Sequence, residues 1–246
     1  MRNLNPAVSV IIPTYCEEET IEGCLKSVVN QRFHGKIETI VVDSHSPDKT
    51  RDVAKRTADK VIDLKARGVG RARNAGAKAA ASPILVFLDA DTFLEPNFLT
   101  EIYRNFIDPR VVCVSGVLKS LEALKPLENL FAVLHYGFTN RIAEITAHLG
   151  FPMFPSVCCC ARKSVFEKVG GFAEDMACGE DITFSRKMGQ VGKCLVNNRA
   201  KAFTSVRRIL SCGIRKMYSM YFKNYVKIYL MNQKPWVQDF PHIRTI

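Results

Sequence analysis

The sequence of 246 residues lacks any long uninterrupted apolar run. A helix that spans a bilayer needs about 20 consecutive apolar residues, and the longest apolar stretches here are much shorter. The first residues, MRNLNPAVSVIIP, also lack the apolar stretch and the small-residue cleavage site of a secretory signal peptide. Neither a membrane span nor a secreted protein is therefore indicated, and we expect a cytoplasmic protein.

No C-x-x-C pair occurs among the nine cysteines, although three of them are adjacent in VCCCAR. Adjacent cysteines cannot readily converge on one tetrahedral metal ion, and the odd number of cysteines argues against a complete disulfide framework. We therefore expect reduced thiols in or near the core. Internal repeats and low-complexity linkers are also absent, which excludes a repeat architecture.

Acidic residues are scarce relative to basic ones, since 24 Asp and Glu stand against 35 Lys and Arg, a net charge of +11. Much of the excess lies in residues 206–246, which hold eight Lys or Arg and one acid, Asp239. A basic surface can face nucleic acid, an anionic membrane or a phosphorylated substrate. We expect no nucleic-acid partner, because no recognition helix, aromatic RNA motif or zinc finger accompanies the charges.

Strand-like and helix-like stretches alternate over the first 120 residues. Four apolar, β-branched segments are typical of strands: 8–15, 37–44, 61–65 and 83–91. Near-continuous apolar strands that alternate with helices predict a mostly parallel sheet covered on both faces. Ligands of such sheets bind beyond the carboxyl ends of the strands, and the predicted strands end in the polar residues Thr14, Asp43 and Asp89.

The second half of the chain changes character. A helix is predicted from Leu127 to His148, and further strands and short helices follow. The segment Ile214–Met231 again has helical spacing. A basic, aromatic amphipathic helix can lie in a lipid headgroup layer, and four of the seven tyrosines and the only tryptophan, Trp236, lie between 216 and 236. The same apolar stripe could instead pack on the catalytic domain or on a second subunit.

Two aspartates, Asp89 and Asp91, follow the apolar run 84–88 with one residue between them. This spacing can place both carboxylates on one side of the chain. Adjacent anions repel each other, and a hard divalent cation such as Mg²⁺ or Mn²⁺ removes the conflict by binding carboxylates together with phosphate oxygens. The pair therefore predicts a site for a metal-bound phosphate or diphosphate. The alternative is a turn in which an aspartate only caps the next helix.

The ordered series of motifs resembles the nucleotide-sugar glycosyltransferases of family 2, which have the GT-A fold. The motifs are VSVIIPTYCEEETIEGCLKSV, IVVDSHSPDKT, GVGRARNAGAKAAASPILVFLDADT, and GGF followed by GED. The resemblance covers residues 8 to about 205. It implies an α/β, Rossmann-like, mostly parallel sheet flanked by helices. The implied catalytic domain (1–205) divides into a nucleotide- and metal-binding half (1–118) and an acceptor-side half (119–205), before an amphipathic helical tail (206–246).

The resemblance also implies roles for individual residues. Asp91 would bind the Mg²⁺ or Mn²⁺ that holds the donor diphosphate, and Asp181 of GED would be the general base, with Glu180 beside it. Family members more often read D-D-x-S where this chain has DSHSPD. The alternative interpretation of GED is an acid pair at a helix N-terminus that interacts favourably with the helix dipole. The implied contacts with the nucleotide or the sugar donor are Pro13, Thr14, Glu17, Asp43, Arg73, Asn74 and Asp89.

Arg207 and Arg208 in TSVRR could hold a diphosphate by bidentate hydrogen bonds. In family 2, basic residues after the base motif often meet the leaving diphosphate, and the resemblance makes this role a candidate. A solvated basic turn is the alternative.

The expected function is inverting transfer of a sugar from a UDP- or GDP-sugar to an acceptor hydroxyl, a glycan or a polyprenyl phosphate. Such transfer needs a base for the acceptor and charge stabilisation on the departing diphosphate. A phosphatase of the haloacid dehalogenase type is one rival, with Asp89 as nucleophile, but its D-x-D-x-T motif normally ends the first strand. A non-catalytic nucleotide- or lipid-binding module is the other, and it would leave Asp91 and Asp181 dispensable.

Overall fold

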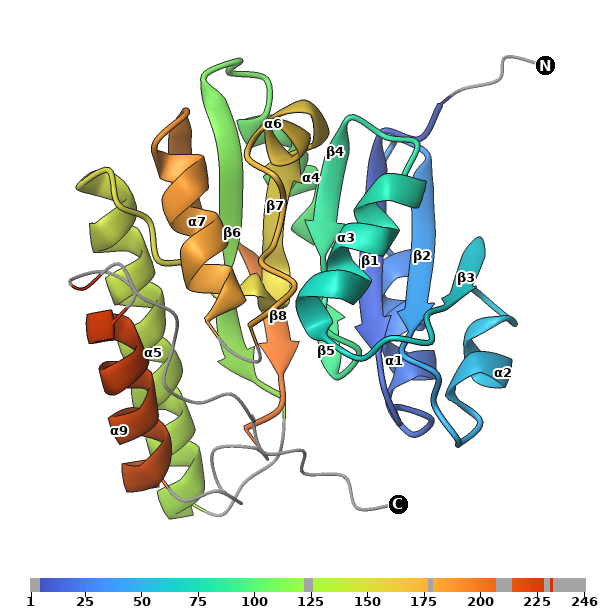
Figure 1. Cartoon of the computed structure of the whole chain (residues 1–246), viewed down its shortest axis with the longest axis horizontal. Coiled ribbons are helices and arrows are strands. Elements are labelled where there is room, and N and C mark those ends of the chain that lie inside the picture. Colours follow the sequence, from blue (N-terminus) through green and yellow to red (C-terminus); the bar gives the residue numbers. More distant parts are fainter. Residues whose placement is uncertain (1–4, 122–125, 177–178, 207–213, 228–230, 232–246) are drawn as a thin grey trace.

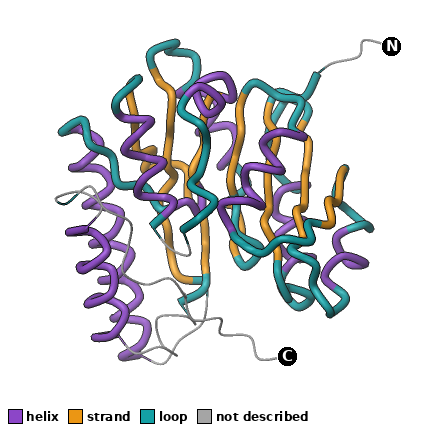
Figure 2. The backbone as a smooth tube through the Cα atoms, viewed as in Figure 1, coloured by secondary structure: helices purple, strands orange, loops and turns teal. Residues whose placement is uncertain are grey.

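An eight-stranded sheet forms the middle layer of the structure, and helices cover both of its faces (Figure 1, Figure 2). The computed structural model describes residues 5–121, 126–176, 179–206, 214–227 and 231. The strands are β1 (Val8–Thr14), β2 (Ile37–Asp43), β3 (Lys60–Asp63), β4 (Ile84–Phe87), β5 (Thr92–Leu94), β6 (Val111–Ser120), β7 (Cys159–Arg162) and β8 (Lys193–Thr204). The helices are α1 (Ile21–Val29), α2 (Thr50–Ala54), α3 (Val69–Ala79), α4 (Phe98–Asn105), α5 (Pro126–His148), α6 (Lys163–Lys168), α7 (Glu180–Gly189) and α9 (Ile214–Tyr225), with a 3₁₀ turn, η1 (Ser156–Cys158).

The strands lie in the order β3-β2-β1-β4-β7-β6-β8-β5. β7 is antiparallel to both of its neighbours and β5 is antiparallel to β8, whereas the remaining pairs are parallel. The predicted α/β architecture with a mostly parallel sheet is therefore confirmed.

The order of strands reverses between β1 and β4, because β2 and β3 lie on one side of β1 and β4 lies on the other. Pairing of β1 with β4 stops at Ile11 and Phe87, while pairing of β1 with β2 continues to Thr14 and Asp43. The carboxyl ends of β1 and β4 thus separate beyond Ile11. A crevice at such a reversal is where open α/β sheets bind their ligands.

The core divides into two layers, one on each face of the sheet. Along β1, Val10 and Ile12 belong to the layer beneath α1 and α4, and Ile11 belongs to the layer beneath α3, α6 and α7. This alternation follows the two-residue period of a strand, and burial on both faces explains why β1 is apolar almost throughout. α5 contributes to both layers, through Ala132 and Ala143.

Most of the predicted elements are present, including the long helix, which is α5. The predicted boundary at residue 118 falls inside β6, and the division of function between two halves stays a prediction. The seven cysteines within the described residues are free thiols, as expected, and the sulfur atoms of Cys113 and Cys159 are 3.4 Å apart, which is too far for a disulfide. No helix in the described parts of the chain is long and apolar enough to cross a membrane.

Of the predicted C-terminal tail, the described part is mainly the helix α9, which lies alongside α5 at one side of the molecule (Figure 1). A hydrogen bond of 2.7 Å joins His135 Nδ1 on α5 to the Tyr218 hydroxyl on α9. Trp236 and the end of the chain lie outside the described residues.

Candidate functional site

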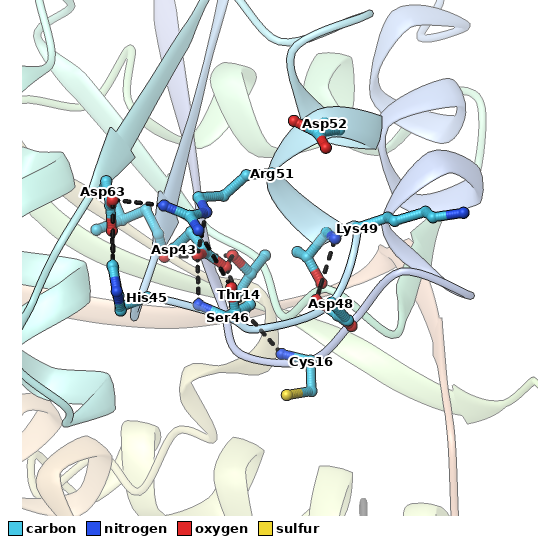
Figure 3. A network of polar contacts seen from close by, with 12 residues as sticks. Thr14, Cys16, Asp43, His45, Ser46, Asp48, Lys49, Arg51, Asp52 and Asp63 are labelled. Carbon is cyan, nitrogen blue, oxygen red and sulfur yellow. Dashed lines mark hydrogen bonds and ion pairs between the residues drawn. The ribbon is translucent and has the colours of Figure 1, made fainter. Parts of the chain in front are cut away.

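Asp43, at the end of β2, is fully buried, and its carboxylate accepts several hydrogen bonds (Figure 3). The Thr14 hydroxyl donates to Oδ1 at 3.0 Å, and the Ser46 amide donates to Oδ2 at 2.8 Å. The guanidinium of Arg51 lies 3.5 Å from Oδ2. These partners tie the end of β1 to the loop after β2, so Asp43 fixes how these two segments lie relative to each other.

The loops after β1 and β2 are also held to each other. The Cys16 amide donates to the Ser46 hydroxyl at 2.9 Å, and His45 Nδ1 lies 3.0 Å from Asp63 Oδ1 (Figure 3). The hydrogen bond from His45 lowers the pKa of Asp63, with a further contribution from the charge of Arg51. Cys16 and His45 have φ of 55° and 58°. Such backbone costs about 1–3 kcal/mol for residues other than glycine and is found preferentially at ligand sites.

Arg73, on α3, joins two of the predicted site carboxylates. Its side chain is 2% exposed, Nη2 lies 2.8 Å from Asp89 Oδ1, and Nη1 lies 2.8 Å from Glu180 Oε1. The guanidinium also sits over the ring of Phe172, 5.3 Å from its centroid. One cation thus connects the end of β4 to the first residue of α7.

Asp181 follows Glu180 in the first turn of α7, after Gly179 in the left-handed region with φ of 80°. The Ile182 amide donates to Asp181 Oδ1 at 2.8 Å. Burial, followed by repulsion from Glu180, raises the pKa of Asp181 to about 7, although Arg73 acts in the opposite direction. A carboxylate with a pKa near the operating pH is suited to general base catalysis.

Two further carboxylates, those of Asp91 and Glu17, lie with Asp89 near α1, where the Cys24 thiol is 3.6 Å from the carbonyl oxygen of Asp89. Burial, followed by the negative charges of Asp91, Asp89 and Glu17, raises the pKa of the Cys24 thiol. The described part of the chain contains no group of three His, Cys, Asp or Glu side chains that could hold a metal by themselves. Asp89 and Asp91 would suit Mg²⁺ or Mn²⁺ only together with substrate phosphate oxygens, which these ions often bind alongside one or two carboxylates.

Asn74, the neighbour of Arg73, makes contacts within the protein. Its Nδ2 donates to the carbonyl oxygen of Phe172 at 2.9 Å and to Glu174 Oε1 at 3.0 Å, and its Oδ1 accepts from the Phe172 amide at 3.0 Å. The side chain therefore holds the turn at Gly170 and Gly171, which precedes α7, against α3. Because α7 opens shortly after this turn, Asn74 and Arg73 together set the position of the GED motif.

Other predicted residues lie at the ends of β1 and β8. Pro13 pairs in register with Val42 within the sheet. Glu17 receives a hydrogen bond of 2.7 Å from the Thr20 hydroxyl, and its amide donates to Thr50. The predicted diphosphate-binding residues Arg207 and Arg208 lie outside the described residues, shortly after the end of β8.

Sequence reasoning missed the aromatic support of the site. Phe172 lies against Phe184 of α7 with ring centroids 4.3 Å apart, and against Phe87 of β4 at 4.9 Å. This cluster lies beneath the Arg73 guanidinium. The GGF motif was a signal for part of it, but the contacts with Phe87 and Phe184 join segments far apart in the sequence. Ser46 and Arg51, the partners of Asp43, were also missed.

Known proteins that are similar to this chain include several glycosyltransferases. The chain is 26% identical over 254 residues to glycosyltransferase AglE of Haloferax volcanii, covering 100% of this chain and 79% of AglE. It is 30% identical over 244 residues to the O-antigen chain rhamnosyltransferase WbaN of Salmonella anatum, covering 96% of this chain and 76% of WbaN.

Among solved structures, the mannosyltransferase PcManGT of Pyrobaculum calidifontis, in complex with GDP-Man and Mn²⁺, matches with a TM-score of 0.74 and 23% identity. The match covers 95% of this chain and 66% of that one, and it supports the GT-A fold. Residues 9–170 match the family model described as glycosyl transferase family 2. This match covers more than half of the chain, and the chain therefore belongs to glycosyl transferase family 2.

Proposed function

We propose that the protein transfers a sugar from a nucleoside diphosphate-sugar to an acceptor hydroxyl or a lipid-linked phosphate or glycan, with inversion at the anomeric carbon. The observation that carries the proposal is the Arg73 bridge. It brings Asp89, from the D-x-D motif, and Glu180, from the GED motif, to one guanidinium, so that the expected donor site and the expected base lie side by side.

The donor would lie in the crevice beyond β1 and β4. Pro13, Thr14 and Glu17 are the proposed residues at its nucleotide end, and Asp89 is the proposed contact with the ribose or the sugar. The donor base stays open between uridine and guanosine. The GDP-Man bound to PcManGT makes a GDP-sugar the first donor to test.

A divalent cation, Mg²⁺ or Mn²⁺, would be held by Asp91 together with the donor diphosphate. When bound, it would supply charge stabilisation for the leaving group. The two carboxylates of the D-x-D motif support this proposal, as does the Mn²⁺ of PcManGT. Arg207 and Arg208 are proposed to meet the same diphosphate.

Asp181 would accept the proton of the acceptor hydroxyl as the hydroxyl oxygen attacks the anomeric carbon. The bond from that carbon to the diphosphate breaks, and the nucleoside diphosphate leaves with the electron pair. Attack on the face opposite the leaving group inverts the configuration. Arg73 and Glu180 would act as positioning residues, because their side chains hold the start of α7 against β4.

Asp43 and Asn74 have a second proposed role beside the donor contacts expected of them. Asp43 would hold Thr14 and the loop after β2 in place, and Asn74 would hold the turn before α7. Their contacts within the protein support this role. The acceptor, and the cytoplasmic location expected from the sequence, stay predictions.

The phosphatase alternative gains no support from the family match or from the fold, in which Asp89 follows the fourth strand along the chain and pairs with Arg73.

One assay distinguishes a non-catalytic binding module from a transferase. Release of free UDP or GDP is measured from a panel of UDP- and GDP-sugars with Mn²⁺, with acceptor candidates, for wild type and Asp181→Asn. Turnover of one donor, lost in Asp181→Asn, supports transfer, whereas tight donor binding without turnover supports a binding module.

A further inference from the structure

One face of α5 and the turn after it expose seven large apolar side chains, and Arg141, which is 71% exposed and paired with Glu144, interrupts them between Phe138 and Ile145. The exposed side chains on α5 recur at intervals of three, four and seven residues, so that they form one face of the helix. The buried residues Ala132, Tyr136 and Ala143 lie on the other face. We call the exposed set the outer stripe: Leu130, Val133, Leu134, Phe138, Ile145, Leu149 and Phe151.

The outer stripe is open to solvent at its middle. A Cβ atom added to Gly137, between Leu134 and Phe138, would meet nothing within 4 Å in the described structure. Single exposed apolar residues are ordinary, but a contiguous apolar patch on a helix marks a surface for a protein or a membrane.

The helix next to the outer stripe is basic. α9, whose sequence IRKMYSMYFKNY contains no acid, lies alongside α5 (Figure 1) and is tied to it by the bond between Tyr218 and His135. Lys216 and Lys223 are exposed on α9, and Phe222 is 70% exposed between them. The helix alongside α5 therefore carries exposed cations and an exposed aromatic ring, and together with an apolar helix face this combination suits a layer of anionic lipid headgroups.

The inner side of α5 contacts the edge of the candidate site. The Tyr136 hydroxyl donates to the carbonyl oxygens of Thr204 and Ser205 at 3.4 and 3.3 Å. Thr204 pairs with Thr92, which directly follows Asp91. Figure 1 shows α5 starting at the edge where β6 and β8 end. A membrane bound to the outer stripe would thus lie on the opposite side of α5 from the strand end that pairs with the residue after Asp91.

We propose that the outer stripe and α9 together bind the surface of an anionic membrane, with α5 lying on the bilayer and not crossing it. Two copies of the chain joined through this face would bring the lysines of two α9 helices together, on molecules that each carry a net charge of +11, and like charges oppose such contact. Anionic headgroups attract the same lysines. The further consequence, that the acceptor is presented by this membrane, rests on the proposed function.

The test is flotation of the full chain with vesicles of phosphatidylcholine alone and of phosphatidylcholine with phosphatidylglycerol. We expect wild type to float with the anionic vesicles and only weakly with the neutral ones. The double variant Leu134→Glu/Phe138→Glu should bind anionic vesicles at least about tenfold more weakly, because it places charge within the apolar face. The matched control is Val29→Glu/Ile107→Glu, which changes two exposed apolar residues outside α5 and α9 and should float like wild type.

Equal flotation of the stripe variant and the control would overturn the proposal, as would failure of wild type to float with anionic vesicles. Sedimentation equilibrium tests whether a second copy of the chain binds the outer stripe instead of a membrane. A wild-type dimer that the stripe variant converts to monomer, with flotation unchanged, would also overturn the proposal. Calorimetric titration of UDP and GDP into the variants keeps the two proposals apart. Flotation without nucleotide binding in any form of the protein would contradict the proposed function and leave the membrane surface standing.

Discussion

At the residue scale, Arg73 carries its charge where the side chain is 2% exposed, between two carboxylates. Removing one partner of a buried ion pair leaves an uncompensated charge and costs about 3–5 kcal/mol. We expect Arg73→Met to lower the free energy of unfolding by about that amount, measured by urea denaturation. The control is Arg110→Met, because Arg110 is 78% exposed in its pair with Asp108 and an exposed ion pair contributes little to stability, so the urea midpoint should stay close to that of wild type. Equal losses in both variants would contradict the account.

Asp181 is the residue on which the proposed chemistry depends. A positioned general base contributes about 10²–10⁴-fold to the rate, so Asp181→Asn should lower kcat by about that factor. The dissociation constant of the nucleotide should stay close to that of wild type. Glu167→Gln, on the neighbouring helix α6, is the control and should keep full activity. A fully active Asp181→Asn variant would remove Asp181 from the mechanism.

The raised pKa of Asp181, about 7, predicts a pH dependence of activity. Since the base must be deprotonated, kcat/KM should rise as the pH increases and level off above about pH 7. The measurement is kcat/KM for the donor from pH 5 to 9. A profile that falls through neutrality would contradict the assignment.

The raised pKa of Asp181 affects stability in the opposite direction, so that stability falls as the pH increases. A carboxyl whose pKa is higher in the folded state than in the unfolded chain favours folding when it is protonated. Its contribution is therefore fully present below the unfolded pKa of about 4 and is lost as the pH rises through about 7. In Asp181→Asn, this part of the pH dependence of unfolding should disappear.

At the element scale, the approach of α3 to the turn before α7 leaves no room for a side chain at Gly70. A Cβ atom there would lie 2.3 Å from the carbonyl oxygen of Ala173. Gly70→Ala should therefore destabilise the fold by about 1–3 kcal/mol and reduce activity, because the turn held by Asn74 must move.

Gly137→Ala is the matched control for this helix position. Nothing lies within 4 Å of the added Cβ atom, and alanine is favoured over glycine inside a helix by about 1 kcal/mol. Thermal unfolding of both variants gives the comparison. A destabilised Gly137→Ala with a neutral Gly70→Ala would contradict the packing described for α3.

The elements that sequence patterns predicted are those with long, regular signals. The strands β1, β2 and β4 carry continuous apolar runs, and α5 carries a helical pattern over more than twenty residues. β5, α4 and β6 were not predicted, and β5 has only three residues. The antiparallel direction of β7 was also missed, because it depends on pairing with β4 and β6, far away in the sequence.

The candidate site was predictable to a similar extent. Motifs named the residues at the strand ends, but the Arg73 bridge joins residues separated by 16 and 107 positions, and no local pattern specifies such partners. The saturation of Asp43 by Thr14, Ser46 and Arg51 was hidden for the same reason. Sequence motifs thus named the candidate residues, and the tertiary structure supplied their contacts.

At the scale of the whole molecule, one continuous sheet brings the D-x-D motif, after β4, and the GED motif to the same edge. The order of strands reverses between β1 and β4, and β7 and β6 carry the sheet onward beneath α7. Arg73 joins the two motifs through its ion pairs with Asp89 and Glu180. The central claim is that this edge binds a nucleoside diphosphate through a metal held by Asp91.

Calorimetric titration of UDP and GDP, each with Mn²⁺ and with EDTA, into wild type and Asp91→Ala tests that claim most directly. We predict that one nucleotide binds wild type with Mn²⁺, that EDTA weakens this binding strongly, and that Asp91→Ala loses it. The nucleotide that binds would also identify the donor base. Absence of binding by both nucleotides, or equal binding by wild type and Asp91→Ala, would contradict the account.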